Sequence, residues 1–209
     1  MEAIAALKPN LILGRQLRTQ DQYAQLSKIA LTVFSLRPGY PWKQNFLLNP
    51  STFGLEAEAK TQLDDYQAAA TAIGAKLGDM FGDKRPTITP LRLMPGRTRL
   101  YAEPSFNGTI LTDVPLPQPQ IEQVEELAVE VSPEQIGKAD ADWIFYGAYG
   151  SPGSTNQDAM LGGALGKTLG AVKSGQARPV SDETWFLGLG VMAANAVLAD
   201  LKGLVAPGS

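Results

Sequence analysis

The sequence predicts an α/β protein in which two lobes are joined by one long helix. Short apolar runs, such as residues 10–13 and 31–34, alternate with helix-compatible segments, which is typical of a parallel sheet covered by helices. Residues 55–77 give the longest helical signal, and a helix of about 35 Å, at ~1.5 Å per residue, suits a strut between lobes. Residues 2–13 also align without a gap with residues 134–145, which indicates two related lobes.

The composition excludes several classes of chemistry. The chain has 209 residues and contains no cysteine and no histidine. It therefore has no disulfide, thiol nucleophile, imidazole base or histidine-bound metal, and a directly bound metal would need carboxylates. Hydrophobic residues make up 44% and charged residues 19%, as in globular proteins, and a formal charge of −3 argues against a nucleic-acid partner.

The first part of the chain, residues 1–54, is predicted to form the N-terminal lobe. Apolar β-branched runs predict strands, and polar segments with one apolar face predict helices. Prolines and glycines between residues 38 and 54 predict a loop with at most a short helix. The expected elements are a helix at 2–8, a strand at 10–14, a helix at 19–28, a strand at 31–34 and a short helix at 42–48.

Residues 55–78 are assigned to the helix between the lobes, with Gly78 as its C-cap, and residues 79–209 to the C-terminal lobe. Pro95-Gly96 predicts a hairpin turn, and Pro90 predicts an edge position or a bulge for its strand. The expected strands are 87–94, 97–102, 127–131, 142–146 and 178–180, and the expected helices are 106–113, one starting near 133, 164–173 and 188–204.

The beginning of the chain resembles the interior of a helix. Ile4 and Leu7 already fall at helical spacing directly after Met1, without the basic segment, apolar run and cleavage site of a signal peptide. No run of about 18 apolar residues could span a membrane. We therefore expect that N-terminal sequence is missing from this chain.

The echo between the two halves predicts a ligand site. Each stretch reads as a short helix, a polar turn and a buried strand, although any two βα units of an α/β fold share this order. Ligands of α/β sheets bind outside the carboxyl ends of the strands. Residues 14–15 of one lobe and 147–150 of the other would then meet at a shared cleft.

A set of ordered stretches, spread over most of the chain, carries a resemblance to a known family: residues 2–13, 26–34, 101, 105–108, 110–111, 130–134, 139–145, 171–173 and 185–190. Together they resemble the substrate-binding proteins of ABC importers for iron-siderophores, whose lobes are joined by one rigid helix. The resemblance implies two Rossmann-like lobes, no enzymatic activity, no covalently bound cofactor, a ferric siderophore as ligand and an ABC permease as partner. It also implies a periplasmic or lipid-anchored location, and cobalamin and haem binders share the same scaffold.

By this resemblance the C-terminal lobe is complete and the N-terminal lobe lacks its first strands. Uncovered strands favour association, so we expect a homodimer through the N-terminal lobe or a rearranged N-terminal half. The chain departs from the family at Leu31, Pro115 and Gly166, where Pro, Gly and an aromatic residue are usual, and at residues 46–54. A degenerate homologue that no longer binds ligand and acts as an interaction module is therefore the alternative function.

Arginine and aromatic side chains are the candidates for holding such a ligand. Guanidinium groups are permanently charged donors for anionic, oxygen-rich ferric siderophores, and aromatic rings could stack on chelating groups. Each candidate could instead be a solvated surface residue or a core residue. The predicted ligand-binding residues are Arg15, Arg18, Trp42, Arg92, Arg97, Arg99, Tyr149 and Trp185. No metal ligand is expected from the chain, because the siderophore would hold the iron.

Two acidic residues are candidates for contact with the permease. In the family one acidic residue on each lobe docks on permease arginines, and the echo places Glu2 and Glu134 at these positions. A carboxylate at a helix start is also favoured by the helix dipole alone. Residues 162–168 look like a phosphate-binding loop, but Gly162 stands one residue too close to the Gly-Lys pair, which argues against a nucleotide site.

Overall fold

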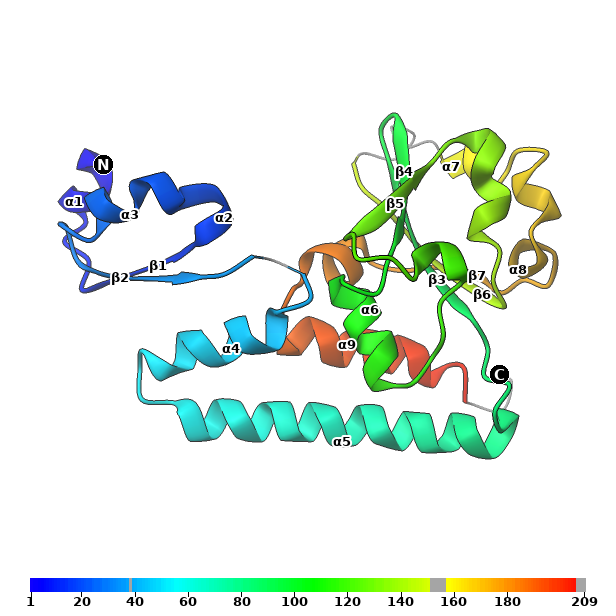
Figure 1. Ribbon diagram of the computed structural model, residues 1–209, viewed down its shortest axis with the longest axis horizontal. Coiled ribbons are helices and arrows are strands. Elements are labelled where there is room, and N and C mark those ends of the chain that lie inside the picture. The colour runs from blue at the N-terminus through cyan, green and yellow to red at the C-terminus, as the bar shows by residue number, and fades with distance from the viewer. Residues whose placement is uncertain (38, 151–156, 206–209) are drawn as a thin grey trace.

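A computed structural model describes residues 1–37, 39–150 and 157–205 of the chain. It contains two separate sheets set against a layer of long helices, which confirms the predicted α/β class (Figure 1). One sheet has two strands, and the other has five strands in the order β5-β4-β3-β6-β7. Within the described residues, no helix combines the length and the apolar character that a membrane span requires.

The N-terminal unit, residues 1–35, contains the smaller sheet. Strands β1 (Leu11–Arg15) and β2 (Leu31–Ser35) are parallel, with Leu11 opposite Leu31. The single helix predicted at 19–28 is instead a series of short helical segments, which are α2 (Gln16–Thr19), a 3₁₀ turn (Gln20–Gln22) and α3 (Tyr23–Leu26). Few side chains of this unit are buried, so little packing supports a longer helix.

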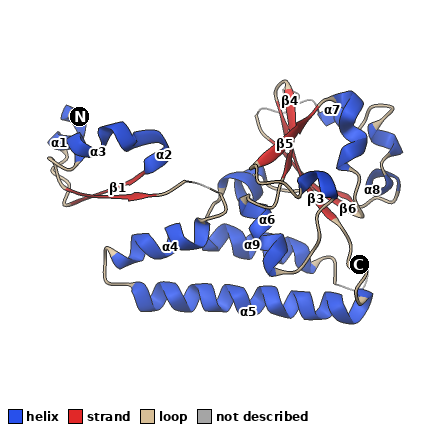
Figure 2. Ribbon diagram, in the orientation of Figure 1, coloured by secondary structure: helices blue, strands red, loops and turns tan. Residues whose placement is uncertain are grey.

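Two antiparallel helices form the base of the molecule (Figure 2). Helix α4 (Trp42–Ser51) is longer than the sequence predicts, and its last turn includes Pro50. Helix α5 (Glu56–Phe81) continues through Gly78, so the expected C-cap at that residue is wrong. The helix ends at Gly82, whose φ of 56° suits glycine and whose N–H donates to the Gly78 carbonyl at 2.8 Å.

Trp42 joins this base to the C-terminal part of the chain. Its side chain is 1% exposed and packs edge-on against Tyr66 of α5 and Phe106 of α6 (Phe106–Asp113). Its Nε1 donates to Thr109 Oγ1 at 3.0 Å. An aromatic cluster of this kind buries a large apolar area, so it holds α4, α5 and α6 as one block.

The larger sheet is built around β3 (Ile88–Met94), which pairs antiparallel with β4 (Arg97–Tyr101) and parallel with β6 (Trp143–Ala148). The outer strands are β5 (Ala128–Val131) and β7 (Ala177–Pro179). The edge position or bulge expected for Pro90 is therefore wrong, since β3 is central. The ladder to β4 begins only at Leu91, so the N–H that proline lacks is not required there.

Two hydrophobic clusters cover this sheet. One includes Ile88, Phe145 and Trp185, and it packs against α5, α6 and α9 (Val191–Lys202). The other includes Leu91, Ile144 and Ile136. Near the second cluster lie a 3₁₀ segment at Pro133–Ala139, α7 (Gln157–Met160), a 3₁₀ turn at Gly166–Thr168 and α8 (Gly170–Lys173). The π-helical turn Glu183–Leu187 contacts α9.

The sequence echo corresponds to a structural repeat. Helix α1 (Glu2–Ala6) leads through a turn into β1, and the 3₁₀ segment Pro133–Ala139 leads through a turn into β6. The departure at Gly166 also has a steric cause. A Cβ at this residue would lie 2.0 Å from the carbonyl oxygen of Met160, so no side chain fits without movement.

A buried carboxyl group lies beside the larger sheet. Glu122, in the 3₁₀ turn Gln120–Glu122, is 0% exposed and accepts hydrogen bonds from Thr89 Oγ1 at 2.8 Å and Gln118 Nε2 at 2.6 Å. Gln118 Nε2 also donates to the Tyr101 carbonyl at 2.7 Å. Continuing the β3–β4 register by one residue places Tyr101 opposite Pro90. Burial raises the pKa of Glu122 to about 8, against the lowering effect of the hydrogen bonds.

We expect the free energy of unfolding to fall as the pH rises from about 4.5 to about 8. The folded pKa of Glu122 lies above its unfolded value, so the folded state alone keeps the proton in this interval. Each unit by which the folded pKa exceeds the unfolded pKa corresponds to about 1.4 kcal/mol in the free energy of unfolding. Urea unfolding between about pH 5 and pH 9 should show a flatter profile for Glu122→Gln than for the wild type. The exposed control Glu125→Gln should keep the wild-type profile, and equal profiles in all three proteins would contradict the assignment.

Candidate ligand-binding site

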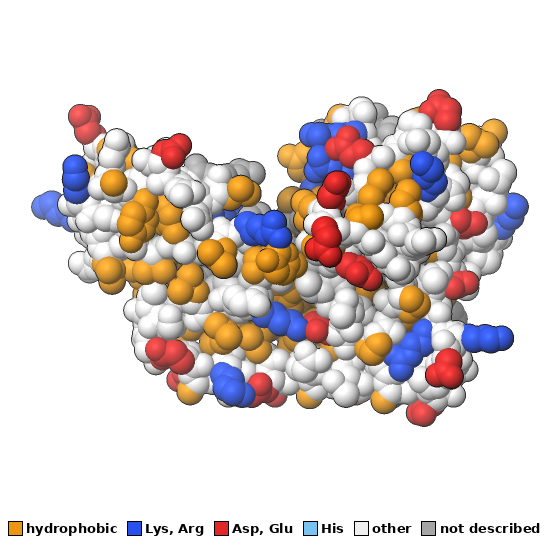
Figure 3. Space-filling view, viewed as in Figure 1, with side chains coloured by type: hydrophobic (Ala, Val, Ile, Leu, Met, Phe, Trp, Pro, Cys, Tyr) orange, Lys and Arg blue, Asp and Glu red, His pale blue; other side chains and the backbone are white. Residues whose placement is uncertain are grey.

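A cavity of about 280 Å³ lies between the N-terminal unit and the larger sheet, and we call it the cleft cavity. The space-filling view shows the molecule hollowed between these two parts (Figure 3). Its lining comes from both sides of the hollow: Arg15, Leu17, Gly39, Arg92, Tyr101, Phe106, Asn107, Leu127, Phe186, Leu187 and Leu189. The structure therefore brings Arg15 and Arg92, two of the predicted ligand-binding residues, to one cavity.

Arg92 is held in place by an ion pair. Its side chain projects from the central strand β3 and is nearly buried, and its Nε and Nη2 donate to the two carboxylate oxygens of Asp182, each at 2.7 Å. Its Nη1 donates to the Tyr101 hydroxyl at 3.3 Å. Burial lowers the pKa of Arg92, but the hydrogen bonds to Asp182 and Tyr101 outweigh this effect and raise it. The charge on Arg92 is therefore mostly neutralised by the protein itself.

Tyr149 covers the same guanidinium group. The Arg92 guanidinium carbon lies 4.7 Å from the centre of the Tyr149 ring and 5.6 Å from that of Phe186. Tyr149 is 50% exposed, so its outer face is open to solvent. A cation between aromatic rings is a favourable arrangement, and it places one aromatic surface beside the cleft cavity.

Arg15 differs from Arg92 because it is exposed at the end of β1, and no ion pair joins it to another described residue. It also borders a second space of about 180 Å³, together with Trp42 and Asn45. Its guanidinium group is therefore available to an anion that enters from the cleft. The side chain of Arg18, another predicted ligand-binding residue, lies outside what the structure describes.

Arg97 and Arg99 form a separate exposed cluster with Glu130 of β5. Glu130 Oε1 lies 3.5 Å from Arg97 Nη1 and 2.8 Å from Arg99 Nη2, and hydrogen bonding from Arg99 lowers the pKa of Glu130. Neither arginine lines the cleft cavity. Arg99 is directly opposite Arg92 in the β3–β4 register, so the cluster shares a sheet face with Arg92 and carries a net positive charge.

The structure buries Trp42 and Trp185, two of the predicted ligand-binding residues, in the core of the protein. Trp42 is 1% exposed in the block of α4, α5 and α6, although it borders the smaller space near Arg15. Trp185 is 0% exposed, stacks on Phe145 at 4.9 Å and donates from Nε1 to Asp200 at 2.7 Å. Core packing stabilises both rings, because burial of a large apolar ring is favourable.

Asn107 is a site residue that the sequence reasoning missed. It lines the cleft cavity and is 1% exposed, and neither its Nδ2 nor its Oδ1 has a hydrogen-bond partner in the described part of the chain. The next residue explains its position. A Cβ at Gly108 would lie 2.4 Å from the Ala102 carbonyl, so glycine allows α6 to start directly against the end of β4. The Ser-x-x-Gly spacing at residues 105–108 signals this close approach.

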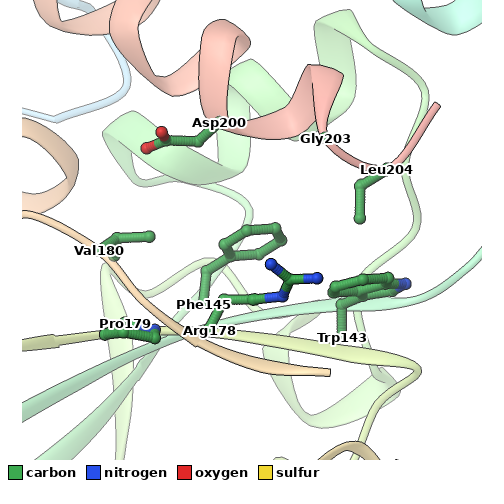
Figure 4. A pocket seen from close by; sticks show the side chains of 8 residues that line it. All are labelled: Trp143, Phe145, Arg178, Pro179, Val180, Asp200, Gly203 and Leu204. Carbon is green, nitrogen blue, oxygen red and sulfur yellow. The ribbon is translucent and has the colours of Figure 1, made fainter. Parts of the chain in front are cut away.

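A third cavity, of about 160 Å³, lies between β6, β7 and the end of α9 (Figure 4). Arg178 lies over the ring of Trp143 at 5.3 Å, and the Asp200 carboxylate already accepts from Trp185. Its lining includes none of the predicted ligand-binding residues. No cluster of three or more acidic side chains suited to a metal ion occurs among the described residues.

Glu2 and Glu134 are both exposed in the first turns of the two repeated segments. Helix α1 and the segment Pro133–Ala139 lie on the side of the molecule away from α5 (Figure 1). A hydrogen bond from Ser132 lowers the pKa of Glu134, which keeps that carboxylate charged.

Comparison with known proteins finds a matching family profile and several similar relatives. A family profile described as periplasmic binding protein matches residues 1–180. The chain is 33% identical over 213 residues to the probable siderophore-binding lipoprotein YfiY of Bacillus subtilis, which covers 97% of this chain. The chain is 26% identical over 206 residues to an achromobactin-binding periplasmic protein of Dickeya dadantii. This match covers 96% of the chain and 67% of that protein. The chain spans only 65% of the length of YfiY.

Solved structures of siderophore-binding proteins also match the fold of this chain. The crystal structure of Staphylococcus aureus SirA complexed with staphyloferrin B matches with a TM-score of 0.82 and 26% identity, over 96% of this chain and 72% of that one. The protein from the fuscachelin gene cluster of Thermobifida fusca matches with a TM-score of 0.79 and 26% identity, over 98% and 77%.

Asp182→Asn should destabilise the protein by roughly 3 kcal/mol, because it leaves the buried Arg92 cation without its counter-ion. The change should be measured by urea unfolding, with the slope of the transition compared to that of the wild type. The matched control is Glu130→Gln, which removes the carboxylate of an exposed arginine cluster and should change stability little. Equal losses in the two variants would show that Asp182 does not neutralise a buried charge.

Proposed function

This chain belongs to the periplasmic binding protein family, and on that premise we propose that it captures a ferric siderophore in the cleft cavity for delivery to an ABC importer. The family binds ligands and does not catalyse reactions on them, so the site is a place of capture. The single observation that carries the proposal is that one cavity is lined by Arg15 from the N-terminal unit and by Arg92 and Tyr101 from the larger sheet.

The chemistry of the lining supports an anionic, partly apolar ligand. Arg15 offers a guanidinium group that no other described residue pairs, and Arg97 and Arg99 outnumber Glu130 on the same sheet face as Arg92. Leucine and phenylalanine side chains form most of the rest of the lining. The chain has no histidine or cysteine, so the siderophore would enclose the iron and the protein would contact only the organic shell.

The volume of the cavity sets how much of the ligand it takes. Binding pockets of small molecules usually measure about 300–1,000 Å³, and the cleft cavity at about 280 Å³ is slightly smaller than this range. It would therefore hold one arm of a siderophore, with the iron centre nearer to the exposed arginines. The family and the names of the relatives support an extracytoplasmic location, in the periplasm or at the cell surface through a lipid anchor. Glu2 and Glu134 are proposed to face the permease.

We expect a ferric siderophore to bind with a dissociation constant of about 1 μM or tighter, measured by calorimetry or by quenching of tryptophan fluorescence. Arg15→Glu should weaken binding about tenfold, more at low salt, because it reverses the charge of the unpaired arginine in the lining. Lys76→Glu on the exposed side of α5 is the charge-matched control. Failure to bind catecholate, hydroxamate and citrate complexes would overturn the proposal, and binding of cobalamin or haem instead would redirect it within the family.

A second function, self-association, is favoured by the N-terminal unit. Leu7, Leu17 and Leu31 are 79%, 67% and 68% exposed, so the N-terminal unit leaves several large apolar side chains open to solvent. Exposed apolar strands recruit other strands. This surface would fit a second copy of the same chain, and it would let the chain act as an interaction module whether or not it binds ligand.

Light scattering should therefore show a dimer at micromolar concentration, and Leu31→Lys in β2 should shift it toward the monomer. The control Met192→Lys replaces a side chain that is 85% exposed on α9 and should leave the dimer intact. A wild-type chain that stays monomeric at ~100 μM would rule out self-association through this surface.

A further inference from the structure

We propose that Asn107 is a specificity-determining residue that recognises an amide-bearing arm of the ligand. The proposal rests on the proposed function, since it concerns the same cavity, and it names the chemical group that the cavity selects. The carrying observation is a side chain that is 1% exposed, lines the cleft cavity and has no hydrogen-bond partner for either amide atom within the described residues.

Such a group is unusual in a folded protein. Most buried polar side chains are hydrogen-bonded, because an unpartnered donor or acceptor loses its contacts with water without replacement. An asparagine kept for structure would have partners in its own helix or in the neighbouring loop. Asn107 has neither among the described residues, so its amide keeps two unused contacts in the wall of the cavity that it lines.

The polar groups around Asn107 are already engaged elsewhere. Ser105 Oγ accepts from the Gly108 N–H at 3.0 Å, and Thr109 Oγ1 donates to the Phe106 carbonyl at 2.8 Å while accepting from Trp42. Arg92 uses its guanidinium group on Asp182 and Tyr101. No described residue supplies a partner for the Nδ2 or the Oδ1 of Asn107, so a molecule that enters the cavity is the proposed partner of both atoms.

The two unused atoms define the class of group that fits. Nδ2 needs an acceptor and Oδ1 needs a donor, so a carboxylate or a deprotonated catechol oxygen satisfies only half of the site. An amide supplies both a carbonyl oxygen and an N–H. The apolar walls formed by Leu127, Leu187 and Leu189 also favour a neutral arm over a charged one. The anionic chelate would then face Arg15, outside this subsite.

The test compares two iron complexes in wild type and Asn107→Leu. Ferri-bacillibactin carries amides in its arms, whereas ferric citrate has none. The substitution should weaken binding of ferri-bacillibactin by about tenfold or more and change binding of ferric citrate by less than about twofold. It should also raise the midpoint of thermal unfolding of the ligand-free protein, by about 2–4 °C, because a buried amide without partners is replaced by an apolar side chain. Asn195→Leu, on the exposed side of α9, is the matched control.

The outcomes separate this inference from the proposed function. A wild type that binds ferric citrate but not ferri-bacillibactin, or an Asn107→Leu variant that binds both as the wild type does, overturns the role of Asn107 and leaves siderophore capture standing. A wild type that binds no ferric siderophore overturns both. A fall in the unfolding temperature of ligand-free Asn107→Leu overturns the inference independently of any ligand, because it assigns the amide a structural role.

Discussion

The burial of Trp42 is the contact on which the arrangement of the helices and the two sheets depends. The ring lies between α5 and α6 and donates a hydrogen bond to Thr109, so the first turn of α4 is fixed to the C-terminal part of the chain. Asp113 strengthens this junction, because it pairs with Lys43 at 2.7 Å and accepts from the Tyr66 hydroxyl at 2.7 Å. Burial and the contact with Asp113 raise the pKa of Tyr66, which keeps that hydroxyl a donor. Since β2 leads into α4, this junction sets where Arg15 stands relative to the larger sheet.

Three kinds of polar group line the cleft cavity: a paired cation, an exposed cation and a buried amide. Arg92 is neutralised by Asp182, so it can support the cavity wall without attracting a strongly bound anion. Arg15 is exposed and can interact with an anionic ligand at the edge of the cleft. Asn107 is neutral, buried and without partners in the described structure. The arrangement separates charge attraction at the mouth from selective hydrogen bonding inside, which agrees with a site for a large chelate carrying neutral arms.

Local pattern predicted many elements well, and the exceptions have physical causes. The strands around β3, the long helix and the hairpin turn at Pro95-Gly96 follow from hydrophobic periodicity and turn residues. Helix α5 passes Gly78 and is capped by Gly82 instead, because Gly82 is the residue that adopts a positive φ. Pro90 lies in a central strand because Gln118 donates to the carbonyl opposite it. Gln118 lies 28 positions after Pro90, so a rule that considers only neighbouring residues cannot predict this hydrogen bond.

The sequence by itself determined the α/β class, the repeated helix-to-strand units, the resemblance to siderophore-binding proteins and the absence of histidine and cysteine chemistry. Composition and periodicity are enough for these, since they depend on neighbouring residues. Only the tertiary structure decided which candidates reach the cleft. It buried Trp42 and Trp185, paired Arg92 with Asp182 across 90 positions of chain, and placed the amide of Asn107, which has no partner among the described residues, in the wall of the cavity. Burial and pairing arise from contacts between distant segments, so no local pattern could assign them.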